Sequence, residues 1–370
     1  MKKYTTLITA AGILLLLFLV IPRAEASSKI SSYKASLPIH SYGLTSTSPK
    51  GYSPSEIKKA YNLPAWGGHG TIAIIAAYDD PGIEKDLEVF TKQYGLAPCT
   101  TANGCFEKYS LDPNKKTDPN WGLEKALDVE WSHAIAPQAH ILLVEAKSPS
   151  GPNLLDAVDY ARKRKDVTAI SMSWGGREFT GETDLDAHFV SQNGAVFFAS
   201  SGDSGAGVSW PAVSKNVIGV GGTSLVVSSS SVIFEKAWNG SGGGISSFES
   251  QPDYQKTYDV LKSHGMRAVP DVAYNADPRT GFSVYHSNGT KKNWYVLGGT
   301  SAGAPQWAAI YSLGLSATLP KLYGDKANLY SSNYFRDIRS GSNGECTYYC
   351  NARSHYDFIT GLGTPLTINF

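Results

Sequence analysis

The stretch Gly299-Thr300-Ser301-Ala302-Gly303-Ala304-Pro305 decides how the rest of the sequence is interpreted. Small residues surround a serine, and the apolar run from Trp307 to Ile310 that follows them predicts a buried helix. Ser301 then lies at the start of that helix, where backbone N–H groups are unpaired and the helix dipole is positive. A serine in this place can attack a carbonyl group while backbone donors hold the resulting oxyanion. An ordinary N-cap serine is the alternative, and for this stretch alone it is the better explanation.

The composition is that of a large globular chain with balanced charge. The 370 residues are 42% hydrophobic and 18% charged, and the formal net charge is +1. A chain of this length can bury a large core, and one large domain accounts for it. The balanced charge gives no reason to expect a nucleic acid or a membrane surface as a partner, and we expect a monomer.

The N-terminus has the pattern of a secretory signal peptide. Lys2 and Lys3 precede an apolar run at 7–21, and Ala24-Glu25-Ala26 follows it with small residues at the spacing of a cleavage site. We expect removal of residues 1–26 and a secreted, extracellular protein without stable membrane association. An uncleaved anchor is the alternative, but the run is shorter than the ~20 apolar residues that a membrane span requires.

Domain boundaries and disulfides follow from composition. Residues 27–51 are rich in serine, threonine and tyrosine and are interpreted as a leader or linker, whereas residues 52–370 are expected to form the folded domain. Four cysteines in an exported chain indicate two disulfides. Three pairings are possible, and we expect the local ones, Cys99 with Cys105 and Cys346 with Cys350. Neither couple has zinc-site spacing, so we expect no zinc.

Apolar runs alternate with helical patterns along the chain. Continuous apolar runs are typical of parallel strands covered on both faces, whereas apolar spacings of three and four residues are typical of helices. We expect strands at 71–77, 140–145, 169–174, 195–200 and 217–220, helices at 83–94, 154–163 and 184–193, and a hairpin at 225–238. This alternation predicts an α/β fold with a parallel sheet.

A predicted helix that starts at Asp118 carries two acidic residues on one face. Glu124 and Asp128 are four residues apart, so their carboxylates lie close together. Like charges at this spacing destabilise an isolated helix by roughly a few tenths of a kcal/mol, and a compensating interaction is expected. Two solvated acids are the alternative, which this segment alone favours.

Two further segments end strands in glycine-rich loops. Asp203 follows the strand at 195–200, and Ser173-Trp174-Gly175-Gly176 follows the strand at 169–174. Sites form at the carboxyl ends of strands in an open parallel sheet, which places Asp203 at the edge of a site. Gly175 and Gly176 would let a peptide backbone approach and pair with this strand.

Together these motifs resemble those of the sedolisins, a family of serine-carboxyl peptidases with a subtilisin-like fold. The resemblance runs from about Tyr52 to the C-terminus, and its motifs occur in the family's order: Glu124-x-x-x-Asp128, Ser173-Trp174-Gly175-Gly176, the loop at 201–205 and the stretch at 299–305. It implies a three-layer fold in which helices flank a mostly parallel central sheet.

The resemblance also implies a role for each residue. Ser301 would be the nucleophile, Glu124 its general base, and Asp128 the residue that orients Glu124. Asp203 would lie at the oxyanion hole, and Trp174 resembles a family tryptophan that supports the carboxylate network. Ser173, Gly175 and Gly176 would bind the substrate with Trp174.

The implied chemistry favours activity at acid pH. Burial and a like-charged neighbour raise one pKa of a carboxyl pair, so Glu124 and Asp128 can accept the serine proton and return it to the leaving amine. Ionised Asp203 would repel an oxyanion, whereas protonated Asp203 can donate a hydrogen bond to it. We expect an endopeptidase that cleaves polypeptides well below neutral pH. A tripeptidyl exopeptidase of the same family and a catalytically idle binding relative are the alternatives.

An ordinary subtilisin triad fits the sequence less well. That triad needs an aspartate at the end of the first strand, where Ala76 stands, and a histidine soon after it. His69 precedes the strand and is interpreted as a loop residue, and His133 as a packed or capping residue. Some sedolisins have a glutamate at the Ala76 position, for which Asp79 could substitute.

A calcium site is implied near the C-terminus. Asp337 and Asp357 would supply carboxylates, and backbone carbonyls would come from Ile338 and from positions near Arg353 and His355. Calcium prefers hard oxygen ligands of this kind. Two loop aspartates that cap turns are the alternative, and the family usually has glycines where Arg353 and His355 stand.

The chain departs from the family pattern in its N-terminal region. Sedolisins usually carry a large folded prodomain, but only residues 27–50 lie between the predicted signal peptide and the domain. A segment of that length is too short to form such a unit. We expect either that folding needs no prodomain or that the short leader performs part of its task.

Overall fold

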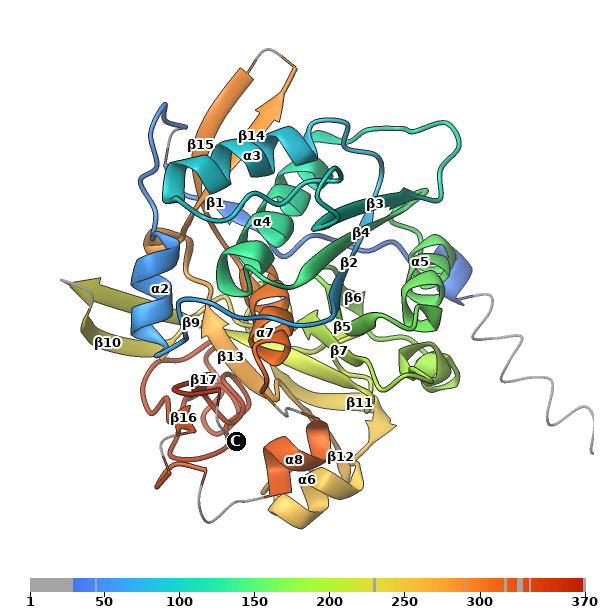
Figure 1. The fold of residues 1–370 in the computed structure, drawn as a ribbon. Coiled ribbons are helices and arrows are strands. Elements are labelled where there is room, and N and C mark those ends of the chain that lie inside the picture. Colours follow the sequence, from blue (N-terminus) through green and yellow to red (C-terminus); the bar gives the residue numbers. More distant parts are fainter. Residues whose placement is uncertain are drawn as a thin grey trace, which may run out of the picture.

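One large sheet, most of it parallel, forms the centre of the molecule (Figure 1). The computed structural model describes residues 29–43, 45–228, 231–289, 291–315, 318–324, 329–332 and 334–368, so the predicted signal peptide lies outside the described residues. The strand order is β10 (Ser231–Ala237), β9 (Val217–Ser228), β7 (Val196–Ser200), β5 (Val167–Met172), β2 (Thr71–Ala77), β4 (His140–Ala146) and β3 (Phe106–Ser110), and β13 (Val272–Asn275) lies beside β9. Neighbouring strands run parallel except β10, which is antiparallel to β9.

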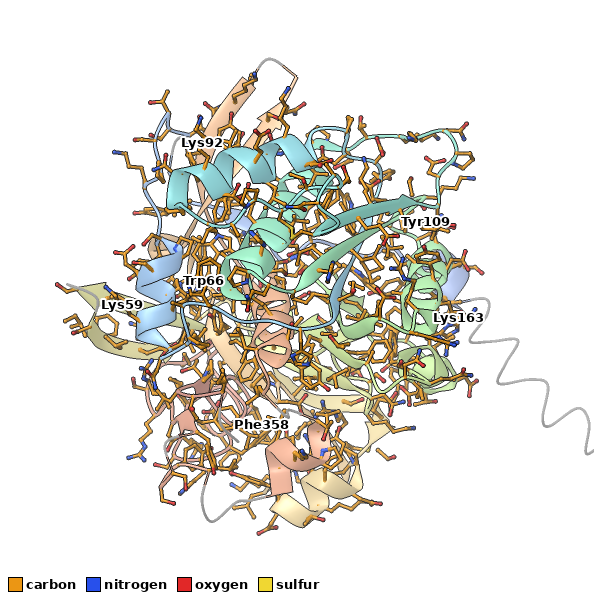
Figure 2. All side chains as sticks on the ribbon, in the orientation of Figure 1. Lys59, Trp66, Lys92, Tyr109, Lys163 and Phe358 are labelled. Carbon is orange, nitrogen blue, oxygen red and sulfur yellow. A yellow bond between two sulfur atoms is a disulfide. The ribbon has the colours of Figure 1, made fainter. Side chains whose placement is uncertain are left out.

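The central strands are apolar because helices cover both faces of the sheet. Every residue of β2 is buried, as its continuous apolar run predicts. On one face, α4 (Pro119–Ile135) and α7 (Gly303–Ser312) pack against each other and against the sheet. On the other face, α5 (Gly151–Lys163) packs on β4, β2 and β5. The predicted α/β fold, a parallel sheet between helical layers, is confirmed, and side chains fill the space between the layers (Figure 2).

Side chains cap the starts of two helices. Ser53 caps α2 (Pro54–Ala60) through a capping box with Glu56. Asp118 caps α4 by accepting hydrogen bonds from the N–H groups of Asn120 and Trp121. The predicted helix at 83–94 is α3 (Ile83–Tyr94), which packs on α4.

Two predicted elements differ from those in the structure. The α-helix predicted at 184–193 is instead a 3-10 helix, η1 (Glu182–Phe189). The carboxylates of Glu182 and Asp186 bond to the Phe179 N–H and the Ser214 hydroxyl, which ties this segment to loops outside it. The predicted strand at 217–220 extends to Ser228 as β9, and its distal half pairs with β10 to form the predicted hairpin.

Smaller elements surround the sheet. A hairpin of β14 (Phe282–Asn288) and β15 (Lys291–Gly298) packs beside α3 and α4, and β1 (His40–Ser41) pairs with its second strand. The remaining elements are β6 (Gly176–Arg177) with β8 (Ser209–Trp210), β11 (Gly244–Ser250) with β12 (Met266–Val269), β16 (Phe335–Arg336) with β17 (Thr364–Pro365), α6 (Asp253–Tyr258), α8 (Leu319–Gly324), η2 (Pro278–Thr280) and η3 (Thr300–Ala302). In the described part of the chain, no helix combines the length and apolarity needed to cross a bilayer.

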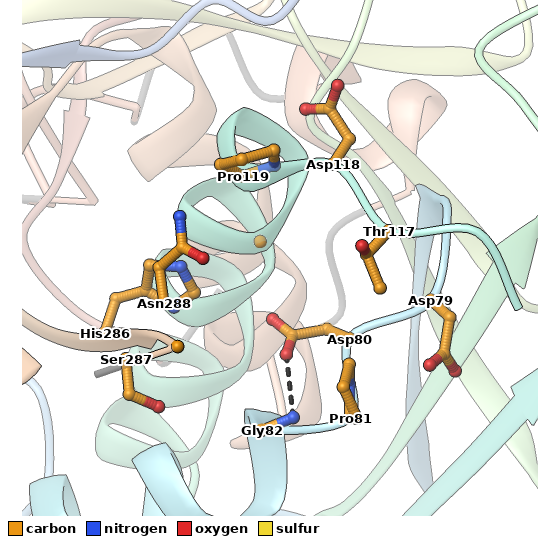
Figure 3. A pocket seen from close by; sticks show the side chains of 12 residues that line it. Asp79, Asp80, Pro81, Gly82, Thr117, Asp118, Pro119, His286, Ser287 and Asn288 are labelled. Atoms are coloured by element: carbon orange, nitrogen blue, oxygen red, sulfur yellow. Dashed lines mark hydrogen bonds between the residues drawn. The ribbon is translucent and has the colours of Figure 1, made fainter. Parts of the chain in front are cut away.

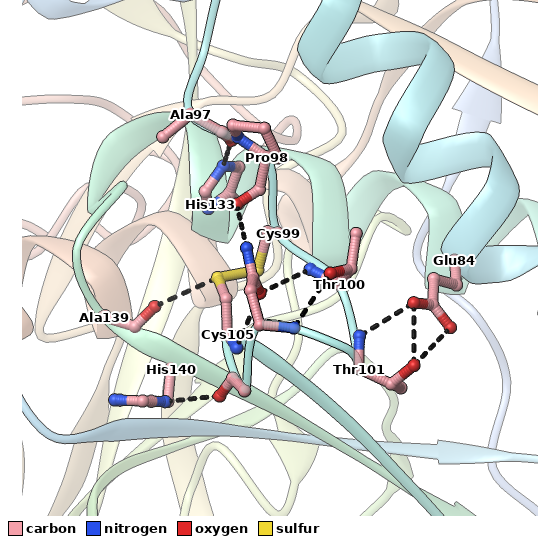
Figure 4. Close-up of a disulfide and its surroundings, with 12 residues drawn as sticks. Glu84, Ala97, Pro98, Cys99, Thr100, Thr101, Cys105, His133, Ala139 and His140 are labelled. Atoms are coloured by element: carbon pink, nitrogen blue, oxygen red, sulfur yellow. Dashed lines mark hydrogen bonds between the residues drawn. A yellow bond between two sulfur atoms is a disulfide. The ribbon is translucent and has the colours of Figure 1, made fainter.

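Both local disulfides form. Cys99 is bonded to Cys105 and Cys346 to Cys350, which confirms the predicted pairing. His133 lies buried beside the first disulfide, and its Nε2 is 2.8 Å from the Ala97 carbonyl oxygen (Figure 4). Both sulfurs at this place are oxidised, so they offer no thiolate to a metal ion.

Candidate active site

Helix α4 brings the two predicted carboxyl groups together. Glu124 and Asp128 are fully buried on the same face of the helix, one turn apart. The hydroxyl of Ser173 donates a hydrogen bond of 2.9 Å to Oδ1 of Asp128 and lies 3.2 Å from the backbone carbonyl of Ser301. Ser173 therefore links the carboxyl pair to the segment that carries Ser301.

Burial governs the titration of this pair. It raises the pKa of Glu124 well above its usual range, and the nearby charge of Asp128 raises it further. Burial likewise raises the pKa of Asp128, against the hydrogen bond from Ser173, which favours the charged form. The two carboxyls can therefore hold one proton between them at a pH where exposed acids are ionised.

Ser301 lies at the carboxyl-terminal edge of the hairpin, immediately before α7. Thr300–Ala302 form η3, which leads directly into the buried helix, as the sequence predicts. Gly299 precedes this turn with φ +116, a conformation that L side chains rarely adopt, and an added Cβ would lie 2.5 Å from Oδ2 of Asp203. Glycine is therefore required both by the backbone conformation and by the close approach of Asp203.

Glu124 faces the hydroxyl of Ser301. This contact favours the charged carboxylate and so lowers the pKa of Glu124, against the larger upward effect of burial. Oγ of Ser301 and both carboxyl oxygens of Glu124 are buried and have no hydrogen bond of good geometry to the described residues. Catalytic hydrogen bonds often tighten only when the transition state forms, so this arrangement is compatible with proton transfer.

Asp203 contacts Thr300, the residue before Ser301. Its Oδ1 accepts hydrogen bonds of 2.8 Å from the N–H and 2.7 Å from the hydroxyl of Thr300. Its Oδ2 lies 3.1 Å from Nε2 of His40, and interaction with Asp203 raises the pKa of this histidine. The structure thus brings the other three predicted catalytic residues, Glu124, Asp128 and Asp203, close to Ser301.

The loop after β5 forms backbone hydrogen bonds with another part of the chain. Gly175 pairs antiparallel with an extended segment, because its N–H and C=O both bond to the backbone of Ser36. Trp174 is buried and donates its indole N–H to the Ile75 carbonyl, so this donor holds the loop to β2. Gly176 begins β6 and lies against the ring of Tyr33.

The extended segment comes from the predicted leader. Residues 34–41 run through the cleft, and the N–H of Ser301 donates a hydrogen bond of 3.1 Å to the Pro38 carbonyl. Beyond Pro38, β1 pairs His40 with Gly298 and Ser41 with Leu297. No local pattern in the sequence predicts this contact, because the segment has no apolar periodicity and its partners lie in distant parts of the chain.

His69 and Asp79 make their contacts away from Ser301. The backbone N–H of His69 bonds to Ser312 at the far end of α7, and ten helical residues separate the two ends by about 15 Å. Asp79 forms an ion pair of 3.0 Å with Lys108 and lines a separate cavity of about 400 Å³ with Asp80 and His286 (Figure 3). Neither His69 nor Asp79 belongs to the cluster around Ser301.

The predicted calcium residues share one loop near the C-terminus. Oδ1 of Asp337 accepts the N–H of His355 at 3.0 Å, and Oδ2 of Asp357 accepts the N–H of Arg353 at 3.2 Å. Asp357 is buried with no described cation beside it, and burial raises its pKa to about 7. His355 has φ +67, which is the backbone conformation that a glycine would adopt most easily.

Comparison with known proteins agrees with the fold. The subtilase family model, Peptidase_S8, matches residues 42–328, and the chain therefore belongs to the subtilase family of serine-type peptidases. Kumamolisin from Bacillus sp. (strain MN-32) is 31% identical over 365 residues, which cover 87% of this chain and 63% of kumamolisin. Sedolisin from Pseudomonas sp. (strain 101) is 28% identical over 367 residues, which cover 87% of this chain and 61% of sedolisin.

A solved structure supports a narrower assignment within the subtilase family. Pseudomonas sedolisin, described as a serine-carboxyl proteinase, superimposes with a TM-score of 0.73 at 26% identity, over 86% of this chain and 96% of that one. Sphericase, at 18% identity and a TM-score of 0.57, shares the fold. Within the subtilases, the chain belongs with the sedolisins. It spans about three fifths of the length of the two curated relatives.

Proposed function

We propose that the protein is a serine-carboxyl endopeptidase that hydrolyses polypeptides in acid. The observation that carries the proposal is the position of Glu124, which faces the Ser301 hydroxyl from a fully buried place beside Asp128. A buried carboxyl pair with raised pKa values supplies a base that differs from the histidine of an ordinary subtilisin.

Each residue of the site has a role in the proposed mechanism. Ser301 attacks the scissile carbonyl, and Glu124 accepts its proton while Asp128 and Ser173 hold Glu124 in place. The oxyanion is stabilised by the Ser301 N–H and by protonated Asp203. Glu124 then returns the proton to the leaving amine, and a water molecule hydrolyses the acyl-enzyme with the same carboxyl as base.

Endopeptidase activity is favoured over tripeptidyl cleavage. The leader segment extends through the cleft on both sides of Ser301, and more than three residues precede Pro38 along the same path. A tripeptidyl peptidase has to close its cleft three residues before the scissile bond. Mapping of the products from a long peptide tests this assignment, since internal fragments support it and a ladder of tripeptides contradicts it.

Peptidase activity is tested with denatured protein as substrate at acid pH. We expect hydrolysis by the wild type, loss of measurable turnover in Ser301→Ala, and near wild-type turnover in Ser204→Ala, which changes an exposed serine next to Asp203. Thermal unfolding should show that Ser301→Ala retains the fold. A wild-type chain that binds but does not cleave the substrate would indicate the idle binding relative instead.

We also propose that the C-terminal loop binds a calcium ion. The ion would be held by Asp337 and Asp357 with backbone carbonyls from Ile338, Arg353 and His355, and it would stabilise the loop. The buried Asp357 without a described cation partner supports this proposal. Arg339 contacts Asp337 at 2.7 Å from an exposed position and can move away when the ion binds.

We also propose that the protein acts outside the cell on polypeptides that it encounters there. The signal-peptide pattern at 1–26 and the two predicted disulfides support export. The N-terminal sequence of the protein isolated from culture medium tests this assignment.

A further inference from the structure

Asp80 and His286 line one pocket beside the start of α4, apart from the cluster around Ser301 (Figure 3). The pocket has a volume of about 400 Å³, and Thr117 and Asp118 also line it. Both side chains are buried, with 6% of Asp80 and 4% of His286 exposed. Oδ2 of Asp80 and Nε2 of His286 nevertheless have no hydrogen-bond partner among the described residues. Buried polar atoms of this kind cost free energy unless a ligand or a water molecule satisfies them.

Asp86 fixes the orientation of the His286 ring. Nδ1 of His286 lies 3.2 Å from Oδ2 of Asp86, and the same carboxylate accepts the N–H and the hydroxyl of Ser287 at 2.9 and 2.6 Å. A carboxylate only accepts hydrogen bonds, so Nδ1 of the ring carries the hydrogen. In the neutral ring, the lone pair is then on Nε2. Histidines that bind metal ions are commonly held in this way, by a carboxylate on the other ring nitrogen.

The carboxyl group of Asp80 is fixed as well. Its Oδ1 accepts the N–H of Gly82 at 2.9 Å. The nearby Lys108 forms an ion pair of 3.0 Å with Asp79 and donates to the backbone carbonyl of Asp80 at 2.8 Å. In the described part of the chain, no cationic side chain bonds to Oδ2 of Asp80. This oxygen is therefore available to a cation that enters the pocket.

The two unpartnered atoms approach each other at Gly122. A Cβ on this residue would lie 3.1 Å from Nε2 of His286 and 3.3 Å from Oδ2 of Asp80, so both atoms lie against the same face of Gly122. Glycine is a poorer helix former than alanine, and here its lack of a side chain leaves the space beside both acceptors open. Two acceptors that face the same space attract a cation and disfavour an anion.

The chemistry of the two atoms selects among cations. Imidazole nitrogen together with carboxylate oxygen suits zinc and similar transition-metal ions, whereas calcium and magnesium prefer oxygen ligands. No third histidine, cysteine or acidic side chain of the described residues comes within reach of the same ion, so water molecules would complete its coordination. The two ligands include no cysteine, and the spacing of the cysteines therefore does not bear on this pocket.

We propose that the pocket binds one divalent transition-metal ion, with zinc as the ion to be tested, through Nε2 of His286 and Oδ2 of Asp80. Asp80 follows β2 and His286 belongs to β14, so the ion would tie the central sheet to the hairpin beside it. Two protein ligands leave coordination positions open to water. The pocket shares no residue with the cluster around Ser301, and its zinc binding is independent of peptidase activity.

Isothermal titration calorimetry with zinc chloride tests the pocket in the untagged full chain that carries Ser301→Ala. The titration is made at about pH 7.5, because zinc binds neutral imidazole. Saturating calcium is present throughout, so that the proposed calcium loop does not take up zinc. We expect one zinc ion per chain, and binding at least about tenfold weaker when Asp80→Asn or His286→Gln is added. The matched controls Asp156→Asn and His69→Gln change exposed residues outside the pocket and should bind zinc as the parent does.

Gly122→Ala gives a second test that keeps both ligands. Its methyl group would occupy the space beside the two acceptors, and alanine is favoured in a helix interior. We expect a folded variant whose zinc binding is at least about tenfold weaker than that of the parent. Thermal unfolding checks that each variant is folded.

Three results would overturn the inference. A parent chain that binds no zinc would indicate that only water fills the pocket. Undiminished binding in Asp80→Asn and His286→Gln would place the ion elsewhere on the molecule. Equal binding by Gly122→Ala and the parent would show that the ion does not lie beside the two acceptors.

Discussion

Asp203 can serve an oxyanion only if its second oxygen carries a proton. Its Oδ1 accepts two hydrogen bonds from Thr300, so the orientation of the carboxyl is fixed. Its Oδ2 is the free edge that faces His40 and, beyond it, the Pro38 carbonyl. An ionised carboxylate at this edge repels the developing charge, whereas a protonated one donates to it.

This requirement predicts the behaviour of Asp203→Asn. The asparagine amide can accept from Thr300 with its oxygen and donate with its nitrogen at every pH. We expect the upper limb of the kcat/KM profile to move to higher pH in Asp203→Asn, with Asp79→Asn as a control whose profile stays unchanged. An Asp203→Asn profile that coincides with that of the wild type would contradict the role of the protonated aspartate.

At this scale the sequence predicted which residue types meet but not what occupies the cleft. Spacing placed Glu124 and Asp128 on one face of a helix, and strand order placed Asp203 and Gly175 at one edge of the sheet. The contacts of Ser36, Pro38 and His40 depend on a path across the folded surface. No local pattern encodes such a path, so it emerged only from the structure.

At the scale of elements, α4 and α7 hold the site together by packing on each other and on the sheet. The central strands of the sheet were predictable because continuous burial leaves a continuous apolar run, whereas β3, in which buried and exposed residues mix, and the short β13 were missed. The hairpin of β14 and β15 was missed, since its strands lie outside the main sheet and mix buried with exposed residues without strict alternation. The 3-10 form of η1 was missed because its helical pattern competes with a local bond from the Phe179 N–H to Glu182 and a long-range bond from the Ser214 hydroxyl to Asp186.

The proposed calcium site in the C-terminal loop leads to a prediction about thermal stability. A bound calcium ion would stabilise the folded state and not the unfolded chain, so a chelator should lower the melting temperature by several degrees. In Asp357→Asn the chelator should have little further effect, because one ligand is already lost. Differential scanning calorimetry with and without chelator measures both, and equal melting temperatures of the wild type would count against the calcium site.

At the scale of the whole molecule, buried carboxyls make stability depend on pH. Burial is the main cause of the raised pKa values of Glu124, Asp128, Glu130, Glu145 (to about 7), Glu249 (to about 8) and Glu182 (to about 9). Each such group binds more protons in the folded than in the unfolded state, so its stabilising effect is complete in acid and is lost as pH rises through its folded-state pKa. Burial lowers the pKa of Lys58 to about 8, which acts in the opposite direction, but the carboxyls are more numerous.

The free energy of unfolding should therefore be larger near pH 5 than near pH 9, by about 1 kcal/mol or more. Urea denaturation of the Ser301→Ala variant measures it without self-digestion. In the same background, Glu182→Gln should flatten this dependence, because it removes the group with the pKa of about 9. A stability that rises from pH 5 to pH 9 would show that these carboxyls do not titrate as their burial requires.

The proposed mechanism depends most on a buried glutamate that acts as the base for Ser301, and α4 offers a matched pair of residues for testing this role. Glu124 faces Ser301, whereas Glu130, on the same helix and equally buried, accepts the N–H of Tyr285. The measurement is kcat/KM on a peptide at acid pH for Glu124→Gln and Glu130→Gln, each checked for folding. We predict a fall of about 10²- to 10⁴-fold for Glu124→Gln and at most a small change for Glu130→Gln. Turnover by Glu124→Gln that matches that of Glu130→Gln would contradict the assignment.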